Sequence, residues 1–344
     1  MKILRHIHSR VVLLVVVGII ALGVGAGFAL ANGKAAPIGT GVVVVDTNLA
    51  YQGGSGAGTG IVLTSSGEVL TNNHVISGAT TVKVVLPGTG HSYTAHVVGY
   101  DRTADVAVIQ LQGASNLKTL SLGGSSKLTV GQAVTALGNA GGTGSFTSAA
   151  GTVTGLGKAI TASDGQGASE RLTGLIETNA AVQPGDSGGP LLDSGGHVVG
   201  IDTAVSTGYG FQQASAADAY AIPIAKAVTI AQQIESGKAS TTVHIGATAF
   251  LGVQVVSVGT GGYGGYGGYG SQSSSGALIA GVVSGGPAAA AGLAAGDVIT
   301  AIDGHAVASP TGVTSRILSL KPGATITIAY ADQSGAGHTA SVTL

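Results

Sequence analysis

The chain has 344 residues, of which 8% are charged, and its formal net charge at pH 7 is −1. Because no basic cluster stands out, we expect no nucleic-acid partner. The absence of cysteine excludes disulfides, thiol chemistry and cysteine-ligated metals. No group of His, Asp and Glu has metal-ligand spacing, so we expect no metal and no cofactor.

The N-terminal segment has the composition of a membrane-targeting sequence. Residues 1–10 are basic, and residues 11–31 form an uncharged apolar run of 21 residues. At about 1.5 Å per residue, a helix of this length spans a hydrocarbon core of roughly 30 Å. The basic flank should stay cytoplasmic, so the rest of the chain is exported. We predict a single-pass signal anchor at 11–31; the alternative is a signal peptide cleaved after Ala29-Leu30-Ala31, which releases a secreted protein.

Residues 32–40 are predicted to form a short linker, and an all-β body follows it. From residue 41 to about 220, short runs rich in Val, Ile and Thr alternate with Gly, Ser, Asn and Asp. This spacing predicts antiparallel strands in a sandwich or a barrel. The expected strands include 41–45, 81–86, 95–99, 106–111, 133–137 and 198–201. Apolar residues at helical spacing then predict a helix at 224–234, which Pro223 starts and Gly237 ends.

The segment Gly185–Pro190 surrounds one serine, Ser187, with glycines. A serine hydroxyl becomes a nucleophile when a base takes its proton and backbone N–H groups hold the resulting oxyanion. Glycines suit such a turn because they lack a Cβ and let the backbone N–H groups point to one place. The same pattern fits the nucleophile elbow of α/β-hydrolases. An α/β-hydrolase fold would make the protein an esterase. That fold needs a helix after the serine, whereas the residues after Pro190 resemble two strands joined by a turn.

A base and an acid precede this serine in the chain. His74 ends the segment Thr71-Asn72-Asn73-His74, and Asp105 leads directly into the apolar run 106–111. Asp101 is a rival for the acid, but it lies in a turn-like segment. The order is therefore histidine, aspartate, serine, which is one of the orders in which a catalytic triad occurs.

With these three motifs, the chain resembles a chymotrypsin-fold serine protease of the HtrA/Deg type. The resemblance implies two six-stranded β-barrels over residues 41–236. It also implies that Ser187 is the nucleophile, His74 the general base and Asp105 the orienting acid. The oxyanion hole falls on Gly185, Asp186 and Ser187, with the N–H groups of Gly185 and Ser187 as the donors. Asp186 departs from the pattern, because asparagine is commoner there in this family.

The same resemblance places the base of the P1 pocket six residues before the nucleophile. Ala181 occupies that position and is followed by Val182, so no acid is available there for an Arg or Lys side chain. We therefore expect small or medium aliphatic P1 residues, since each buried methylene contributes about 0.8 kcal/mol. The neighbouring pocket wall is predicted at Ile201, Thr203 and Val205.

A boundary at 236–246 separates this body from a last segment, 246–344, that resembles a PDZ domain. Phe250, Leu251, Gly252 and Val253 match its carboxylate-binding loop. Such a domain adds a peptide C-terminus to its sheet as an extra strand. Between residues 259 and 270, a Gly-Gly-Tyr triplet repeats three times. We expect an extended loop there, which acts as a spacer or touches a ligand through its tyrosines.

The predicted protein is thus mostly β: a membrane helix, a double-barrel protease domain and a PDZ domain. Its predicted function is ATP-independent cleavage of unfolded or damaged exported proteins, in a stress-response or quality-control role. The alternative is a non-catalytic peptide-binding chaperone with a latent triad. The resemblance also suggests a homotrimer.

Overall fold

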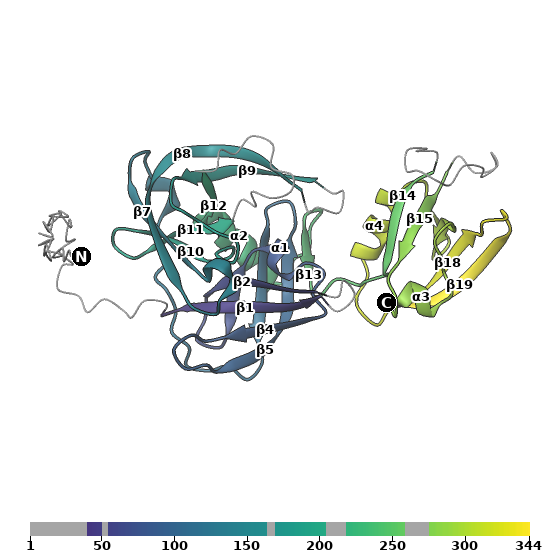
Figure 1. Cartoon of the computed structure of the whole chain (residues 1–344), viewed down its shortest axis with the longest axis horizontal. Coiled ribbons are helices and arrows are strands. Elements are labelled where there is room, and N and C mark those ends of the chain that lie inside the picture. Colours follow the sequence, from purple (N-terminus) through teal and green to yellow (C-terminus); the bar gives the residue numbers. More distant parts are fainter. Residues whose placement is uncertain (1–39, 50–53, 164–168, 204–217, 259–274) are drawn as a thin grey trace, which may run out of the picture. The chain divides into compact units, whose positions relative to one another are not determined.

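The computed structural model describes residues 40–49, 54–163, 169–203, 218–258 and 275–344. In these ranges the chain is mostly β, as predicted (Figure 1). The predicted membrane helix at 11–31 and the Gly-Gly-Tyr repeat lie outside the described residues. None of the helices in the described ranges has the length and apolar character needed to cross a membrane.

Six strands of the first sheet close into a ring, in the order β5-β4-β1-β2-β3-β6, because β5 also pairs with β6. The single-turn helix α1 (Asn73–Ile76) follows β3. The strands of this first barrel are β1 (Val42–Leu49), β2 (Gly54–Val62), β3 (Glu68–Thr71), β4 (Thr81–Val85), β5 (Ser92–Asp101) and β6 (Val106–Leu111).

The second barrel is also closed, in the order β10-β11-β12-β9-β8-β7. Two short 3-10 helices, Ser125–Lys127 and Ala140–Gly142, flank β7. The strands are β7 (Ala133–Gly138), β8 (Thr147–Ser163), β9 (Ser169–Thr178), β10 (Pro190–Asp193), β11 (Val198–Thr203) and β12 (Ala219–Pro223). The prediction of two six-stranded barrels is therefore confirmed.

Strand β6 shows how alternation builds the core. Val106 and Val108 pack in a cluster that also holds Leu175 and Ile201 of the second barrel. Ala107 and Ile109 point the other way, into the interior of the first barrel. Successive strand side chains point to opposite faces, and both faces of this strand are buried. Its sequence is therefore a continuous apolar run. Burial on both faces fixes the position of β6 and of Asp105, which immediately precedes it.

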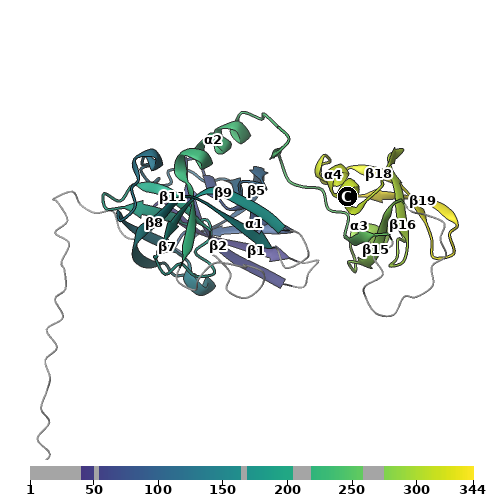
Figure 2. The same ribbon diagram turned by 90° about the horizontal axis from the view of Figure 1, so that it is seen from above.

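Helix α2 (Ile224–Glu235) confirms the helix predicted from periodicity, and it packs through Ile224, Ala227, Ala231 and Ile234. It contacts strands of both barrels (Figure 2). The chain then returns to the first barrel, where β13 (Val243–Ile245) pairs with β5. Strand β13 lies within the predicted boundary region 236–246 and joins that region to the first barrel.

The C-terminal domain is one sheet in the order β14-β15-β16-β18-β19, with β17 paired to β16. It has its own apolar core, which includes Leu251, Ile279 and Ile328. Its elements are β14 (Val253–Ser257), β15 (Ala277–Val282), α3 (Pro287–Ala290), β16 (Val298–Ile302), β17 (His305–Ala306), α4 (Pro310–Leu318), β18 (Thr325–Ala331) and β19 (Gly337–Thr343).

Candidate active site

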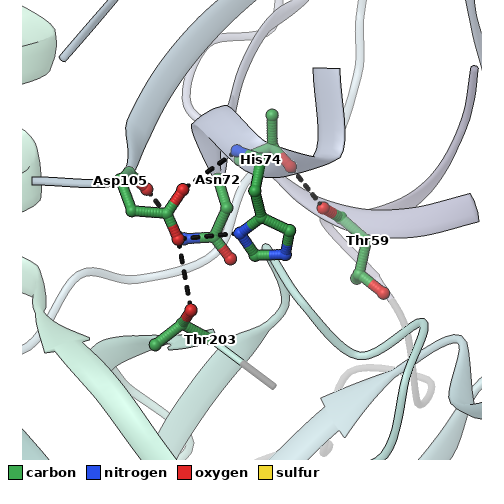
Figure 3. A network of polar contacts seen from close by, with 6 residues as sticks. Thr59, Asn72, His74, Asp105 and Thr203 are labelled. Atoms are coloured by element: carbon green, nitrogen blue, oxygen red, sulfur yellow. Dashed lines mark hydrogen bonds and ion pairs between the residues drawn. The ribbon is translucent and has the colours of Figure 1, made fainter. Parts of the chain in front are cut away.

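His74 and Asp105 are in direct contact (Figure 3). The imidazole Nδ1 of His74 lies 2.8 Å from Asp105 Oδ2, and the His74 backbone N–H donates to Asp105 Oδ1 at 2.9 Å. A carboxylate only accepts hydrogen bonds, so His74 Nδ1 carries the proton in this contact. The neutral ring then has its lone pair on Nε2. The His74 side chain is 48% exposed, so the ring is reachable from solvent.

Two further groups hold the buried Asp105 in place. The Thr203 hydroxyl donates to Asp105 Oδ2 at 3.1 Å, and the Asn72 side-chain amide donates to the Asp105 carbonyl oxygen at 2.9 Å. Asp105 itself has a positive φ of 55°, which non-glycine residues seldom adopt. The rival Asp101 caps the preceding turn instead, because its Oδ1 accepts hydrogen bonds from Thr103 and Ala104.

The loop that carries Ser187 needs its glycines for steric reasons. At Gly188, with φ 86°, a Cβ would lie 2.0 Å from the Thr59 carbonyl oxygen. At Gly185, with φ 99°, a Cβ would lie 2.2 Å from the Asn139 carbonyl oxygen. Gly188 N–H also donates to the Asp202 carbonyl oxygen at 2.9 Å. The loop is therefore packed tightly against both barrels.

Backbone hydrogen bonds of the Ser187 loop lead to residues that lie next to His74 and Asp105 or bind them. On one side, Thr59 N–H donates to the Ser187 carbonyl oxygen at 2.8 Å, and the Thr71 hydroxyl donates to the Thr59 carbonyl oxygen at 2.7 Å. Thr71 ends β3, two residues before α1 begins at Asn73. On the other side, Asp202 pairs with the loop, and its neighbour Thr203 bonds Asp105. The backbone of the Ser187 loop is therefore linked to the segments that carry His74 and Asp105.

Two buried carboxyl groups lie beside this loop. Asp202 is 0% exposed, and within the described ranges neither of its carboxyl oxygens has a hydrogen-bond partner. Burial raises the pKa of Asp202 well above its usual range, and the nearby Asp186 raises it further. Burial also raises the pKa of Asp186, although Asp186 Oδ2 accepts a hydrogen bond from the Gln183 N–H at 2.8 Å.

The predicted oxyanion residues differ in what their N–H groups do. The Asp186 N–H donates to the Gln183 carbonyl oxygen at 3.0 Å, so it is not an oxyanion donor. The turn at 183–186 uses this N–H internally. The peptide N–H groups of Gly185 and Ser187 stay as the predicted donors.

The predicted pocket residues are placed in different surroundings. Ala181 is exposed and Val182 is half-buried, and Val205 lies outside the described residues. Ile201 packs in the core cluster with helix α2, and Thr203 bonds Asp105. Neither of these last two residues lines the cavity described next, and their side of β11 is turned toward the barrel interface. A cavity of about 510 Å³ does open next to Gly185 and Pro184, between Gly141–Gly142 and Ala57.

The predicted carboxylate-binding loop of the C-terminal domain precedes an edge strand. Leu251 is buried, and its carbonyl oxygen accepts a hydrogen bond from the Ala288 N–H at 2.9 Å. Gly252 has φ 81°, and Val253 starts β14, which ends the sheet order and contacts α4. Phe250 is half-buried. An edge strand with a neighbouring helix is the arrangement that accepts an added peptide strand.

Sequence reasoning missed Thr59 and assigned Thr203 to the wrong surroundings. Thr59 lies in a Gly-rich stretch whose composition carries no chemical signal. Thr203 is the last residue of β11. Its role depends on which face of β11 meets Asp105. The Asn72 amide, by contrast, belongs to the motif that identified His74.

Comparison with known proteins is consistent with both domains. Residues 58–201 match the trypsin-like peptidase domain, and residues 249–344 match the PDZ domain. The chain therefore combines a trypsin-like peptidase domain with a PDZ domain.

Its relatives include several serine proteases. It is 35% identical to the serine protease PepD of Mycobacterium tuberculosis over 90% of this chain and 65% of PepD. It is 36% identical to the putative serine protease HhoB of Synechocystis over 76% of this chain and 60% of HhoB. It is 33% identical to the periplasmic pH-dependent serine endoprotease DegQ of Escherichia coli, over 78% of this chain and 55% of DegQ. The chain thus spans about 55% to 65% of the length of these relatives.

A solved structure of the HtrA-type protease AlgW with a tripeptide is similar, with 29% identity and a TM-score of 0.50. The match covers 89% of this chain and 93% of that one. Together these findings show that the chain belongs to the HtrA type of protein, with a trypsin-like peptidase domain followed by one PDZ domain.

Proposed function

We propose that this protein is a serine endopeptidase that hydrolyses peptide bonds of exported proteins through an acyl-enzyme. The observation that carries the proposal is the buried Asp105 carboxylate, 2.8 Å from His74 Nδ1. Asp105 is also bonded to Thr203, whose neighbour Asp202 accepts a hydrogen bond from the Gly188 N–H of the Ser187 loop. The contact between Asp105 and His74 orients the imidazole and stabilises its protonated form.

The reaction follows from these positions. Ser187 Oγ attacks the scissile carbonyl carbon while His74 Nε2 takes the hydroxyl proton. The N–H groups of Gly185 and Ser187 hold the oxyanion. His74 then gives its proton to the leaving amine as the C–N bond breaks, and the acyl-enzyme remains. Water, deprotonated by His74, releases the second product and restores Ser187.

The substrates are proposed to be unfolded or damaged exported proteins, with aliphatic P1 side chains. The PDZ domain is proposed to bind peptide C-termini, with β14 pairing to the peptide and the loop from Phe250 to Val253 holding the carboxylate. Support for an extracytoplasmic location comes from the N-terminal sequence and from relatives named periplasmic, such as DegQ. The membrane anchor at 11–31 and a homotrimer stay predictions.

The test is labelling of the purified chain with a fluorophosphonate probe, together with hydrolysis of casein. We expect labelling of Ser187 and casein cleavage, both lost in Ser187→Ala. A wild-type protein that binds unfolded protein but reacts with neither probe nor casein would instead identify a peptide-holding chaperone, and the proposal would be abandoned.

A further inference from the structure

Thr59 of β2 takes part in four hydrogen bonds beside the nucleophile loop. Its N–H donates to the Ser187 carbonyl oxygen, and its carbonyl oxygen accepts from the Thr71 hydroxyl. Its hydroxyl donates to the Gly185 carbonyl oxygen at 2.7 Å and accepts from the Asn139 N–H at 3.0 Å. The residue is 0% exposed, so no water replaces these partners from bulk solvent.

The four bonds differ in what they require of residue 59. The two backbone bonds are available to any non-proline residue at this position. The two hydroxyl bonds need a side chain that donates and accepts at once, which a serine or threonine hydroxyl does. These two bonds run from the first barrel to two separate loops of the second barrel. The two hydroxyl bonds are therefore the ones that depend on which amino acid occupies position 59.

The hydroxyl completes the fixation of Gly185. The carbonyl of Pro184 is held by the Gly141 N–H at 2.8 Å, and in a planar trans peptide the Gly185 N–H points away from that carbonyl. The peptide on the other side of Gly185 is held by Thr59, through the Gly185 carbonyl oxygen. Both peptide planes around Gly185 are thus anchored. This matters because a glycine with φ 99° otherwise rotates with little steric resistance.

The Asn139 contact extends this fixation to the facing loop. Asn139 Oδ1 accepts a hydrogen bond from the Gly144 N–H at 2.7 Å, and Gly142 N–H donates to the Asn139 carbonyl oxygen at 2.8 Å. The same loop supplies Gly141, which holds Pro184. The Thr59 hydroxyl therefore holds the Gly185 carbonyl directly. Through Asn139 it also positions the loop whose Gly141 holds the Pro184 carbonyl.

We propose that the Thr59 hydroxyl is a positioning group that preorganises the Gly185 N–H for the oxyanion, and so sets kcat without touching substrate. The inference rests on the proposed function, since it assigns Gly185 as an oxyanion donor. A donor held in place before the reaction stabilises the transition state without reorganising, whereas a loose one does not. Loss of the hydroxyl therefore acts on the chemical step and leaves substrate binding unchanged.

The test compares three variants of the full chain. Thr59→Val keeps the shape and removes the hydroxyl, Thr59→Ser keeps the hydroxyl, and Thr229→Val removes an exposed hydroxyl bond to the Ala225 carbonyl in α2. We expect Thr59→Val to lower kcat on a peptide substrate about 10- to 100-fold, because the Gly185 carbonyl and the Asn139 N–H lose their hydrogen-bond partner. KM should stay within about threefold. Thr59→Ser and Thr229→Val should retain kcat within about threefold.

Two further measurements separate positioning from general loss of structure. The pH profile of kcat/KM should keep its apparent pKa in Thr59→Val, because the His74–Asp105 contact is untouched. Thermal unfolding is compared in the Ser187→Ala background, which prevents self-cleavage. If Thr59→Val does not fold, Thr59→Cys, with its weak hydrogen-bonding thiol, takes its place and should be slower than Thr59→Ser.

Several outcomes would overturn the inference. They are a kcat of Thr59→Val within threefold of wild type, a rise in KM that accounts for the loss, or a failure of Thr59→Ser to restore the rate. Wild-type protein that is inactive, or labelling that persists in Ser187→Ala, would instead refute the proposed function itself. The two failures are therefore distinguishable.

Discussion

The buried Asp202 leads to a prediction about stability and pH. Its carboxyl is 0% exposed and has no hydrogen-bond partner within the described ranges, and the neighbouring Asp186 adds negative charge. Asp202→Asn keeps the shape and removes the ionisable group. The new amide also contains a donor, whereas Asp186 Oδ1 has no hydrogen-bond partner among the described residues of the wild type.

The sign follows from the direction of the pKa shift. Burial and Asp186 raise the folded-state pKa of Asp202 above its unfolded value. The folded state therefore binds the proton more tightly, and this contribution to stability is fully present below the unfolded pKa. It is lost as the pH rises through the folded pKa. Wild-type protein should lose stability from acid toward neutral and alkaline pH, and Asp202→Asn should lose less.

The expected gain at neutral pH is about 1–3 kcal/mol, the cost of an unsatisfied buried polar group. For a domain of this size, each kcal/mol shifts the midpoint of thermal unfolding by about 2–4 °C. The assay is calorimetric unfolding between pH 4 and 8, in the Ser187→Ala background. The transition of the peptidase domain is followed separately from that of the PDZ domain, since the two need not unfold together.

A matched control removes a charge elsewhere in the same domain. Asp46→Asn changes a half-buried carboxylate on β1, so it tests whether net charge alone explains the result. We expect no comparable gain from it. A destabilised Asp202→Asn at neutral pH, or an unchanged slope of stability against pH, would refute the reasoning.

Three other predictions concern single contacts. Thr203→Val removes the hydroxyl bond to Asp105 Oδ2; kcat/KM should fall about tenfold or more, because hydrogen bonds to charged groups contribute about 1.5–3 kcal/mol. Steady-state kinetics with Thr203→Ser as the control checks it, and an unchanged rate contradicts the role. Gly188→Ala places a Cβ 2.0 Å from the Thr59 carbonyl oxygen, whereas Gly113→Ala, at φ 72°, meets no atom within 4 Å. Probe labelling should be lost in the first variant and kept in the second, and equal labelling would show that the close approach is unimportant. Gly252→Ala strains a residue at φ 81° and crowds the Phe250 ring; fluorescence anisotropy should show weaker binding of an apolar C-terminal peptide, with probe labelling of Ser187 unchanged. Equal affinity would place peptide binding elsewhere.

Much of the site was predictable because its chemistry lies in short local motifs. Each of the three predicted catalytic residues (His74, Asp105 and Ser187) lies in a short motif, and neighbouring residues of these motifs make contacts that support the site. Asn72 reaches the Asp105 backbone, and Gly188 makes room for the Thr59 carbonyl. The strand at 106–111 and the helix at 224–234 were predictable in the same way, since alternation and helical spacing are properties of neighbouring residues.

The errors arose where the answer depended on the face of a strand. Ile201 and Thr203 share one face of β11, and that face packs against helix α2 and Asp105. Between them, Asp202 points the other way and becomes fully buried. A single charged residue in an apolar stretch has no local signal for burial. The geometry of the turn also decides that the Asp186 N–H binds the Gln183 carbonyl oxygen, and the N–H groups of Gly185 and Ser187 stay as the predicted oxyanion donors.

The amino-acid sequence by itself determined where strands fall along the chain, the glycines of the nucleophile loop and which groups are proposed to react. These depend on residues near each other in the chain. Tertiary structure alone decided that Thr59 meets Gly185, 126 positions away, and that Thr203 meets Asp105, 98 positions away. Such partners are chosen by the packing of two closed barrels against each other, because a hydrogen bond depends on distance and direction in space and not on separation along the chain.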